Sequence, residues 1–196
     1  MDNFWTPYIE VETNSGVREV TLATKHFAKR KVFLIGEINT ESVNRLVSQL
    51  LYLCQDSQEE IDLYINSGGG EVNAGLILYD VIQSMKAPLN IYCMGMAASM
   101  AAVILAGGQK GRRFILPHSK TMIHEPLIRN GVGGSATSIR NLSDSILETR
   151  ELVNSLLAKH TGKTLEEINE ATAYDNYMNA QESVEFGICD EIKNIM

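Results

Sequence analysis

The spacing of apolar residues along the chain changes between the period of a helix and that of a strand. A helix is predicted after Asn39 or Thr40, because apolar residues then recur at helical spacing up to Cys54. A strand is predicted at 61–67, where Ile61, Leu63 and Ile65 alternate with other residues before a run of glycines.

The same two patterns recur in the rest of the chain. Strands are predicted at 31–36, 89–95, 114–117 and 121–126, and helices at about 72–85, from about 98, and at 136–159. Gly95 is expected to form the turn before the helix that starts near Ala98. TLEE (164–167) and NAQE (179–182) fit capping boxes of two further helices. Strands that alternate with helices predict an α/β fold with parallel strands, whose sites gather where strands end and helices begin.

Composition and charge are those of an ordinary globular protein. The 196 residues, 44% hydrophobic and 21% charged, are enough for a single domain with a buried core. A net charge of -7 argues against a general nucleic-acid-binding protein, which needs clustered Lys and Arg. The nearest approach to a basic cluster, Lys25–Lys31, is interpreted as a solvated face.

Neither a membrane nor a metal is indicated. The N-terminal residues lack the basic and apolar regions of a secretory signal. The longest apolar run, Met94–Gly108, is shorter than the roughly 18 residues of a membrane-spanning helix. Cys54, Cys93 and Cys189 are expected to be reduced core thiols of a cytoplasmic protein. No Cys or His pair has metal-site spacing, so neither a metal nor a cofactor is expected.

Two strand-to-helix junctions carry candidate chemistry. The N–H groups of the loop Gly68–Gly70 can bind an anion or a developing oxyanion, although a plain tight turn explains a glycine triplet more simply. Ser99 is expected in the first turn of a helix, where free N–H groups favour negative charge. It is either a nucleophile or a small residue of a tightly packed helix, and the residues alone favour the second interpretation.

A serine nucleophile needs a general base and a group that orients the base. Among the four histidines His124 is the best placed, because it closes an apolar strand at a predicted strand end. His26 and His160 lie in polar contexts that predict exposure, and His118 lies in a predicted turn. The chain has 24 Asp and Glu residues, so spacing does not identify the carboxylate that would orient the base.

Several long segments resemble the proteolytic subunits of the Clp protease, the ClpP family. They are YINSGGGEVNAGLILYD (64–80), CMGMAASMAAVILAGG (93–108) and KGRRFILPHSKTMIHEPL (110–127). LLAKHTGKTLEEINEAT (156–172) and DNYMNAQESVEFGICDEI (175–192) continue the resemblance, which covers about Val32 to Ile192. The string GMAASM with MIHEP downstream is highly specific for this family.

The resemblance implies an α/β fold of the crotonase-like type, built from repeated β-α units, and the activity of a serine endopeptidase without metal or cofactor. Ser99 would be the nucleophile, His124 the general base and Asp175 the carboxylate that orients the base. The backbone N–H groups of Gly70 and Met100 would form the oxyanion hole. Such enzymes degrade unfolded polypeptides to short peptides.

The resemblance also implies an assembly of two stacked seven-membered rings with the active sites inside. An AAA+ unfoldase of the ClpX, ClpA or ClpC type, which consumes the ATP, would feed chains to the rings. Within a single domain 1–196, residues 1–30 would form an axial segment and residues 125–160 a protruding handle that joins the rings. Neither nucleic acid nor a membrane is an expected partner.

The chain departs from the family pattern near the site and in the handle. The usual Ser-Pro-Gly-Gly is Ser-Gly-Gly-Gly at 67–70, which would loosen the loop. The glycine-rich segment 129–135 is longer than usual. Ala173 and Tyr174 replace an Asp-Arg pair that joins the rings, which puts ring stacking or its coupling to the site in doubt.

Two further departures concern partners. In the docking groove for the unfoldase Tyr64 is kept, but Asp62 and Ser84 replace aromatic residues, and the N-terminal segment is unusually polar. Together these departures suggest a divergent paralogue that acts beside a second ClpP type. The alternatives are a ring subunit that only scaffolds or regulates, and a crotonase-type acyl-CoA enzyme, which is disfavoured because it needs no Ser-His-Asp set.

Overall fold

The computed structural model describes residues 7–13, 16–128, 131 and 133–195. The strands span Tyr8–Thr13 (β1), Gly16–Thr21 (β2), Lys31–Ile35 (β3), Ile61–Ser67 (β4), Leu89–Ala98 (β5), Arg113–Ile115 (β6), Lys120–Ile123 (β7), Asn176–Met178 (β8) and Glu191–Ile192 (β9). The helices span Leu22–Ala28 (α1), Thr40–Asp56 (α2), Val72–Ser84 (α3), Met100–Ala106 (α4), Ala136–Thr161 (α5), Leu165–Thr172 (α6) and Ala180–Phe186 (α7).

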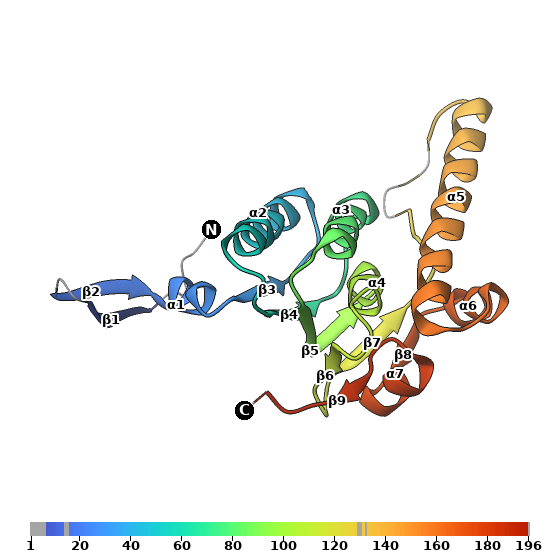
Figure 1. Ribbon diagram of the computed structural model, residues 1–196. Helices are drawn as coiled ribbons and strands as arrows, with labels where there is room; N and C mark the ends of the chain where they lie inside the picture. The colour runs from blue at the N-terminus through green and yellow to red at the C-terminus, as the bar shows by residue number, and fades with distance from the viewer. Residues whose placement is uncertain (1–6, 14–15, 129–130, 132, 196) are drawn as a thin grey trace.

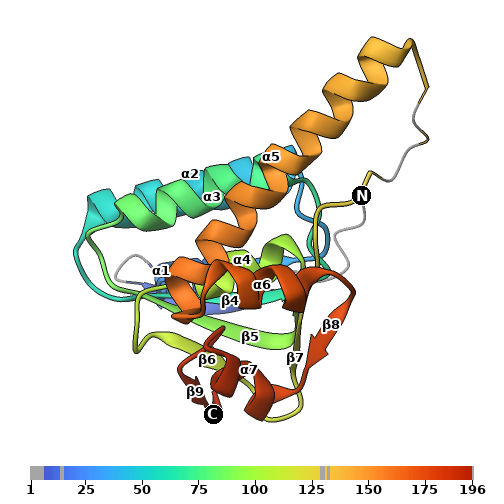
Figure 2. The same cartoon turned by 90° about the vertical axis from the view of Figure 1, so that its right-hand side faces the viewer.

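A mostly parallel sheet forms the centre of the molecule. Within the described residues it has seven strands, in the order β3-β4-β5-β6-β9, and β7 pairs with both β5 and β8. Only β7 and β8 are antiparallel to each other. Helices α2, α3 and α4 lie on one side of the sheet (Figures 1 and 2). The predicted α/β fold with parallel strands is therefore confirmed.

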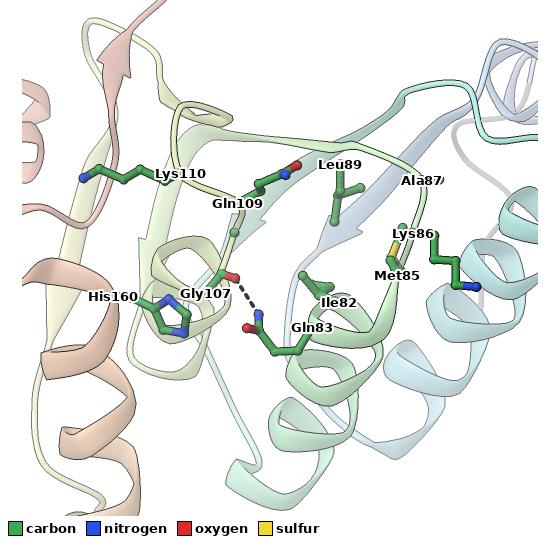
Figure 3. Close-up of a pocket in the computed structure, with 11 residues that line it drawn as sticks. Ile82, Gln83, Met85, Lys86, Ala87, Leu89, Gly107, Gln109, Lys110 and His160 are labelled. Carbon is green, nitrogen blue, oxygen red and sulfur yellow. Dashed lines mark hydrogen bonds between the residues drawn. The ribbon is translucent and has the colours of Figure 1, made fainter.

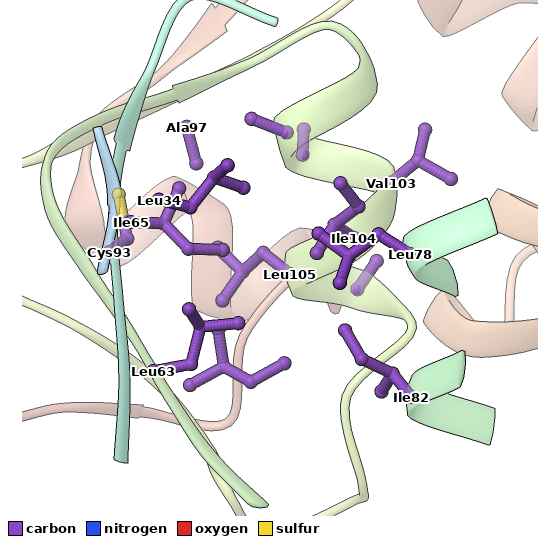
Figure 4. Packing of buried hydrophobic residues seen from close by; sticks show 14 of the residues in the cluster. Leu34, Leu63, Ile65, Leu78, Ile82, Cys93, Ala97, Val103, Ile104 and Leu105 are labelled. Carbon is purple, nitrogen blue, oxygen red and sulfur yellow. The ribbon is translucent and has the colours of Figure 1, made fainter. Parts of the chain in front are cut away.

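The core fills the space between the sheet and these helices. Alternate residues of each strand point toward the helices, so Leu34, Leu63 and Cys93 pack against α4 (Figure 4). Helix α4 is buried all round, since each of its residues is at most 3% exposed. The sequence predicts α2, α6 and α7 correctly, because side chains of their N-cap residues Asn39, Thr164 and Asn179 close capping boxes.

The opposite face of the sheet carries a ladder of four aromatic rings. Phe33, Tyr64, Tyr92 and Phe114 are paired in register on β3, β4, β5 and β6. Their neighbouring ring centroids are 5.3, 5.1 and 5.0 Å apart in stacked geometry. The predicted strand at 31–36 is thus present as β3, but one of its faces is partly exposed, since Phe33 on that face is 40% exposed.

Strand β5 does not turn at Gly95 as predicted. It continues to Ala98, with Gly95 at φ 95°, and its pairing to β4 shifts register between Ile65 and Ser67. Residues 91–93 pair with β6 and residues 96–98 with β7. Glycine allows this bend without a break, because it has no Cβ to clash at positive φ. Strand β5 thus pairs with both β6 and β7, and it ends three residues later than the predicted strand 89–95.

The N-terminal region has more structure than its polar sequence predicts. β1 and β2 form an antiparallel hairpin that extends away from the sheet (Figure 1). The hairpin buries little, so apolar periodicity does not reveal it. The basic segment at 25–31 is not a uniformly solvated face, because Arg30 is buried and donates to the carbonyls of Leu53, Ser57, Glu59 and Glu60.

Helix α5 is long, and its N-terminal half projects beyond the rest of the molecule (Figures 1 and 2). Ile139, Leu142, Leu147 and Leu152 on it are between 39% and 49% exposed. Of the glycine-rich segment before it, residues 129, 130 and 132 lie outside the described residues. In the described part of the chain, no helix combines the length and apolar composition needed to cross a membrane.

A buried ion pair ties the C-terminal ends of two helices to β6. Arg113, only 1% exposed, makes two hydrogen bonds from its guanidinium to Asp190 and donates to the carbonyls of Ala106 and His160. Burial alone would raise the pKa of Asp190. The hydrogen bonds and charge of Arg113, with N–H donation from Arg113 and Gly111, outweigh burial and lower this pKa to about 2.

Asp190→Asn is expected to lower the free energy of unfolding by about 3–5 kcal/mol at pH 7, because it leaves the Arg113 guanidinium without its countercharge. The folded-state pKa of Asp190 lies below the unfolded value of about 3.9. The wild type therefore gains stability from this carboxylate above about pH 4 and loses about 2 kcal/mol as the pH falls toward 2. The variant lacks that pH-dependent contribution. Chemical denaturation over a pH series measures both effects.

Asp56→Asn is the matched control. Asp56 pairs with the buried Arg30 at 3.3 Å, but its own side chain is 59% exposed and four carbonyls also hold Arg30. A loss of no more than about 1 kcal/mol is expected. Equal losses in the two variants would contradict the account of Asp190.

Candidate active site

Ser99 occupies a strained turn between β5 and α4. Its backbone has φ 54° and ψ -125°, a conformation that costs a residue with a side chain roughly 1–3 kcal/mol. The Ser99 N–H donates to Met122 O of β7 at 2.7 Å, and Ser99 O accepts from Ala102 N–H and Val103 N–H. Ser99 is therefore the N-cap of α4. The prediction that it lies in the first turn of the helix is wrong by one position.

The structure brings Ser99, His124 and Asp175 together in one line of hydrogen bonds. Ser99 Oγ lies 2.9 Å from His124 Nε2, and His124 Nδ1 lies 3.1 Å from Asp175 Oδ1. If the Ser99 hydroxyl donates to Nε2, the imidazole is the Nδ1–H tautomer and donates to the carboxylate. This order of nucleophile, base and orienting carboxylate is the one that serine hydrolases use.

The end of the sheet brings His124 and Asp175 side by side. His124 directly follows β7 and Asp175 directly precedes β8, and Ile123 pairs with Asn176 in the antiparallel ladder. The His124 side chain is 14% exposed, whereas that of Asp175 is 58% exposed. Burial therefore does not fix the carboxylate, and its position follows from the backbone that carries it.

The glycine loop packs directly against the turn at Ser99. Gly69 has φ 89°, and a Cβ there would lie 2.7 Å from Ala98 O and from Ser99 Cβ. Gly70 has φ 155°, and a Cβ there would overlap Ile38 O. The side chain of Ser67 accepts the Gly69 N–H at 3.0 Å. These contacts require glycine at 69 and 70, so the two glycines allow close packing against Ser99 and Ile38 as well as a tight turn.

Among the described residues, the hydrogen bonds that hold the glycine loop and the turn at Ser99 do not use the N–H groups of Gly70 and Met100. Ile38 donates to Gly69 O and accepts from Glu71 N–H, so this bridge does not use the Gly70 N–H. Met100 is the first residue of α4, and a first residue has no intrahelical acceptor for its N–H. The assignment of both groups to an oxyanion hole stays a prediction.

A small apolar pocket of about 20 Å³ adjoins the serine. Besides Ser99 and His124 it is lined by Val72, Met100, Val103, Ile123, Pro126, Val153 and Leu157. A larger hollow of about 330 Å³ lies near Leu89, at the other end of β5, with Gln83 and His160 in its wall (Figure 3). Gly107, the C-cap of α4, lines this hollow, whereas Ser99 is the N-cap of the same helix. The hollow therefore lies at the opposite end of α4 from the serine.

The other three histidines lie elsewhere. His26 packs edge-on against Phe33, and His118 is exposed in a turn. His160 is half-buried instead of exposed, and its Nε2 lies 2.7 Å from the Tyr79 hydroxyl. Among the described residues, no three His, Cys, Asp or Glu side chains lie close enough together to hold a metal ion.

The strained serine with its histidine and carboxylate defines the class of a serine hydrolase on an α/β fold. A family model described as Clp protease matches residues 14–195 of the chain. The chain therefore belongs to the Clp protease family, which makes it a ClpP-like serine peptidase. Membership of this family also favours the peptidase over the acyl-CoA enzyme as the interpretation of the sequence.

Gly69→Ala is expected to slow the labelling of Ser99 by a fluorophosphonate at least about 10²-fold. The added methyl group must push the loop away from Ala98 O and Ser99 Cβ, which displaces the N–H groups that we predict to bind the developing oxyanion. Gly68→Ala is the matched control, because a Cβ at Gly68 meets nothing within 4 Å. Equal labelling rates for the two variants would show that the fit of the loop is irrelevant to Ser99.

Proposed function

We propose that the chain is the peptidase subunit of a self-compartmentalised, ATP-dependent protease that degrades unfolded polypeptides to short peptides. The observation that carries the proposal is the line of hydrogen bonds from Ser99 through His124 to Asp175, anchored on a strained serine. A structural serine has no need of a φ of 54° or of an aligned base. Membership of the Clp protease family supports the same activity.

In the proposed mechanism His124 Nε2 takes the proton of Ser99 as Oγ attacks the peptide carbonyl. The new C–O bond pushes the carbonyl electrons onto oxygen, and the N–H groups of Gly70 and Met100 receive this charge. Each such donor contributes about 10²–10³ in rate. His124 then gives its proton to the leaving amine, and the C–N bond breaks to leave an acyl-enzyme.

Water completes the cycle by the same route. His124 removes a proton from water, the hydroxide attacks the ester carbon, and Ser99 leaves with the proton returned by His124. Asp175 accepts the Nδ1–H bond throughout and stabilises the imidazolium that forms twice per cycle. Neither a metal nor a cofactor takes part, and ATP is consumed only by the partner.

We extend the proposal to an assembly of two stacked seven-membered rings. The projecting half of α5 supports it, because Ile139, Leu142 and Leu147 expose apolar area that a second subunit would cover. In this proposal the region 125–160 is the handle between rings. The hairpin β1–β2 within residues 1–30 supplies the axial segment of the single domain, as its extension from the sheet suggests (Figure 1).

The proposed partner is an AAA+ unfoldase of the ClpX, ClpA or ClpC type. Two surface features support a docking site for it. The aromatic ladder from Phe33 to Phe114 lies on the outer face of the sheet, although Asp62 and Ser84 are not aromatic. Beside Phe33 an apolar hollow of about 470 Å³ lies between α1, β3 and α2. A cytoplasmic location completes the proposal and fits the three free cysteines.

A second candidate function is that of a divergent subunit, weakly active or regulatory, that works with a second ClpP type. The specific observation in its favour is the sequence Ala173-Tyr174 before Asp175. Tyr174 is 86% exposed and neither residue can form the ion pair that the family uses between rings. In this alternative the second subunit type supplies the missing contact.

Ser99→Ala is expected to reduce the hydrolysis of a fluorogenic peptide at least about 10³-fold, because it removes the nucleophile and leaves only binding and the oxyanion donors. Native mass spectrometry should show an unchanged assembly. The matched control is Ser48→Ala, since Ser48 lies on the exposed side of α2 and its hydroxyl donates to the Asn44 carbonyl of the same helix. Hydrolysis that survives in the Ser99 variant would end the serine-peptidase proposal.

The purified chain alone separates the two candidate functions. The main proposal predicts an assembly of fourteen copies of the 21.7-kDa chain that degrades an unfolded protein with a standard unfoldase and ATP. The alternative predicts smaller assemblies, or rings with weak activity that rises when the second subunit type is added. Robust protein degradation by this chain alone with the unfoldase would rule out the alternative.

A further inference from the structure

Asn154 is a fully buried polar residue in the middle of α5. Its side-chain Nδ2 donates to Asn169 Oδ1 at 2.7 Å and to Thr172 Oγ1 at 3.1 Å, both on α6. Asn154 and Thr172 are each 0% exposed. A buried amide between two helices therefore holds the last residue of α6.

The bonds of Thr172 fix the orientation of the Asn154 amide. The Thr172 hydroxyl has a single hydrogen, which it donates to Ile168 O at 2.8 Å, so its oxygen is left to accept from Asn154. Asn154 must therefore turn its NH₂ group toward Thr172. Its Oδ1 is then buried with no hydrogen-bond partner in the described part of the chain.

An unpaired buried acceptor is costly, and an apolar side chain at this position would avoid the cost. The Asn154 amide is therefore expected to stabilise the fold less than an apolar side chain at this position would. Its Nδ2 binds Thr172, the residue at which α6 ends and the chain turns toward Asp175.

Thr172 connects the segments that carry His124 and Asp175. Its carbonyl accepts the Glu125 N–H at 2.8 Å, directly after His124, and Asp175 follows three residues later along the chain. Helix α5 also reaches Glu125, since Arg150 Nε lies 3.1 Å from Glu125 Oε2. Arg150 and Asn154 are one helical turn apart, so one face of α5 contacts both segments.

We propose that Asn154 is a positioning residue of the active site: by holding Thr172, it sets the position of Asp175 relative to His124. The inference rests on the proposed peptidase function and deepens it. Asp175 is 58% exposed, so the backbone between Thr172 and Asn176 determines where the carboxylate lies. Loosening Thr172 lengthens the bond to His124 and slows proton transfer without altering where the substrate binds.

Asn154→Leu tests this inference in the full-length assembled protein. The variant keeps a similar volume and removes both the donor and the unpaired acceptor. We expect kcat for a fluorogenic peptide to fall about 10-fold to 100-fold, KM to stay within about 2-fold, and the melting temperature to change little. A merely structural residue would lose activity only together with stability.

Three further comparisons complete the test. Thr172→Val removes the accepting oxygen and should lower kcat like Asn154→Leu, whereas Thr172→Ser keeps that oxygen and should restore it. The double variant Asn154→Leu/Thr172→Val should be no slower than either single variant, because both single variants already remove the bond between Asn154 and Thr172. Ile168→Val is the packing control, since it trims a fully buried side chain of α6 and should leave kcat unchanged.

The outcomes separate this inference from the proposed function. A wild-type kcat in Asn154→Leu, or a kcat in Thr172→Ser as low as in Thr172→Val, overturns the positioning role while the wild-type enzyme still cleaves. A fall in kcat for Ile168→Val as large as for Asn154→Leu also overturns it. A wild-type chain that neither cleaves peptide nor reacts with a fluorophosphonate at Ser99 overturns the proposed function itself.

Discussion

The backbone conformation of Ser99 is the constraint on which the rest of the site depends. A serine at φ 54° persists only because its N–H is fixed by β7 and its C=O by the first turn of α4. The bend of β5 at Gly95 brings the end of the strand to β7. Gly69 packs directly against Ala98 O and Ser99 Cβ. At the far end of α4, Arg113 holds Ala106 O. Both ends of this short buried helix are therefore anchored, which keeps the turn from relaxing.

The partners of the serine come from distant parts of the chain and are held by a different kind of interaction. The β7–β8 ladder and the bond from Glu125 to Thr172 join the segments of His124 and Asp175 through backbone groups. Helix α5 reaches the same two segments through side chains, with Arg150 on one and Asn154 on the other. Ser99 is thus fixed by a rigid turn, whereas His124 and Asp175 depend on the β7–β8 ladder and on side chains of α5.

Features that depend on local hydrogen bonds could be predicted from the sequence, and features that depend on pairing at a distance could not. The caps at Asn39, Thr164 and Asn179 are local, and the helices begin where predicted. The course of β5 beyond Gly95 follows from pairing with β7, which no local pattern contains. The aromatic ladder was not predicted either, although Phe33, Tyr64 and Tyr92 each stand between two apolar residues of a predicted strand and parallel register aligns them.

The same division holds for the site. Ser99 and His124 could be picked out because each follows a strand, but only the resemblance to ClpP singled out one carboxylate of 24. Asn154 gave no signal, because an asparagine in a long helix usually faces water.

Strand β5, which pairs with both β6 and β7, affects when the site can form during synthesis of the chain. The bond that holds the Ser99 N–H can form only after Met122 has been synthesised, and Asp175 can pair with His124 only after β8 has been added, which follows α5 and α6. A nascent chain emerging from the ribosome N-terminus first therefore has a serine but no aligned base or carboxylate. The topology of the sheet therefore delays the alignment of Ser99, His124 and Asp175 until β8 has been synthesised.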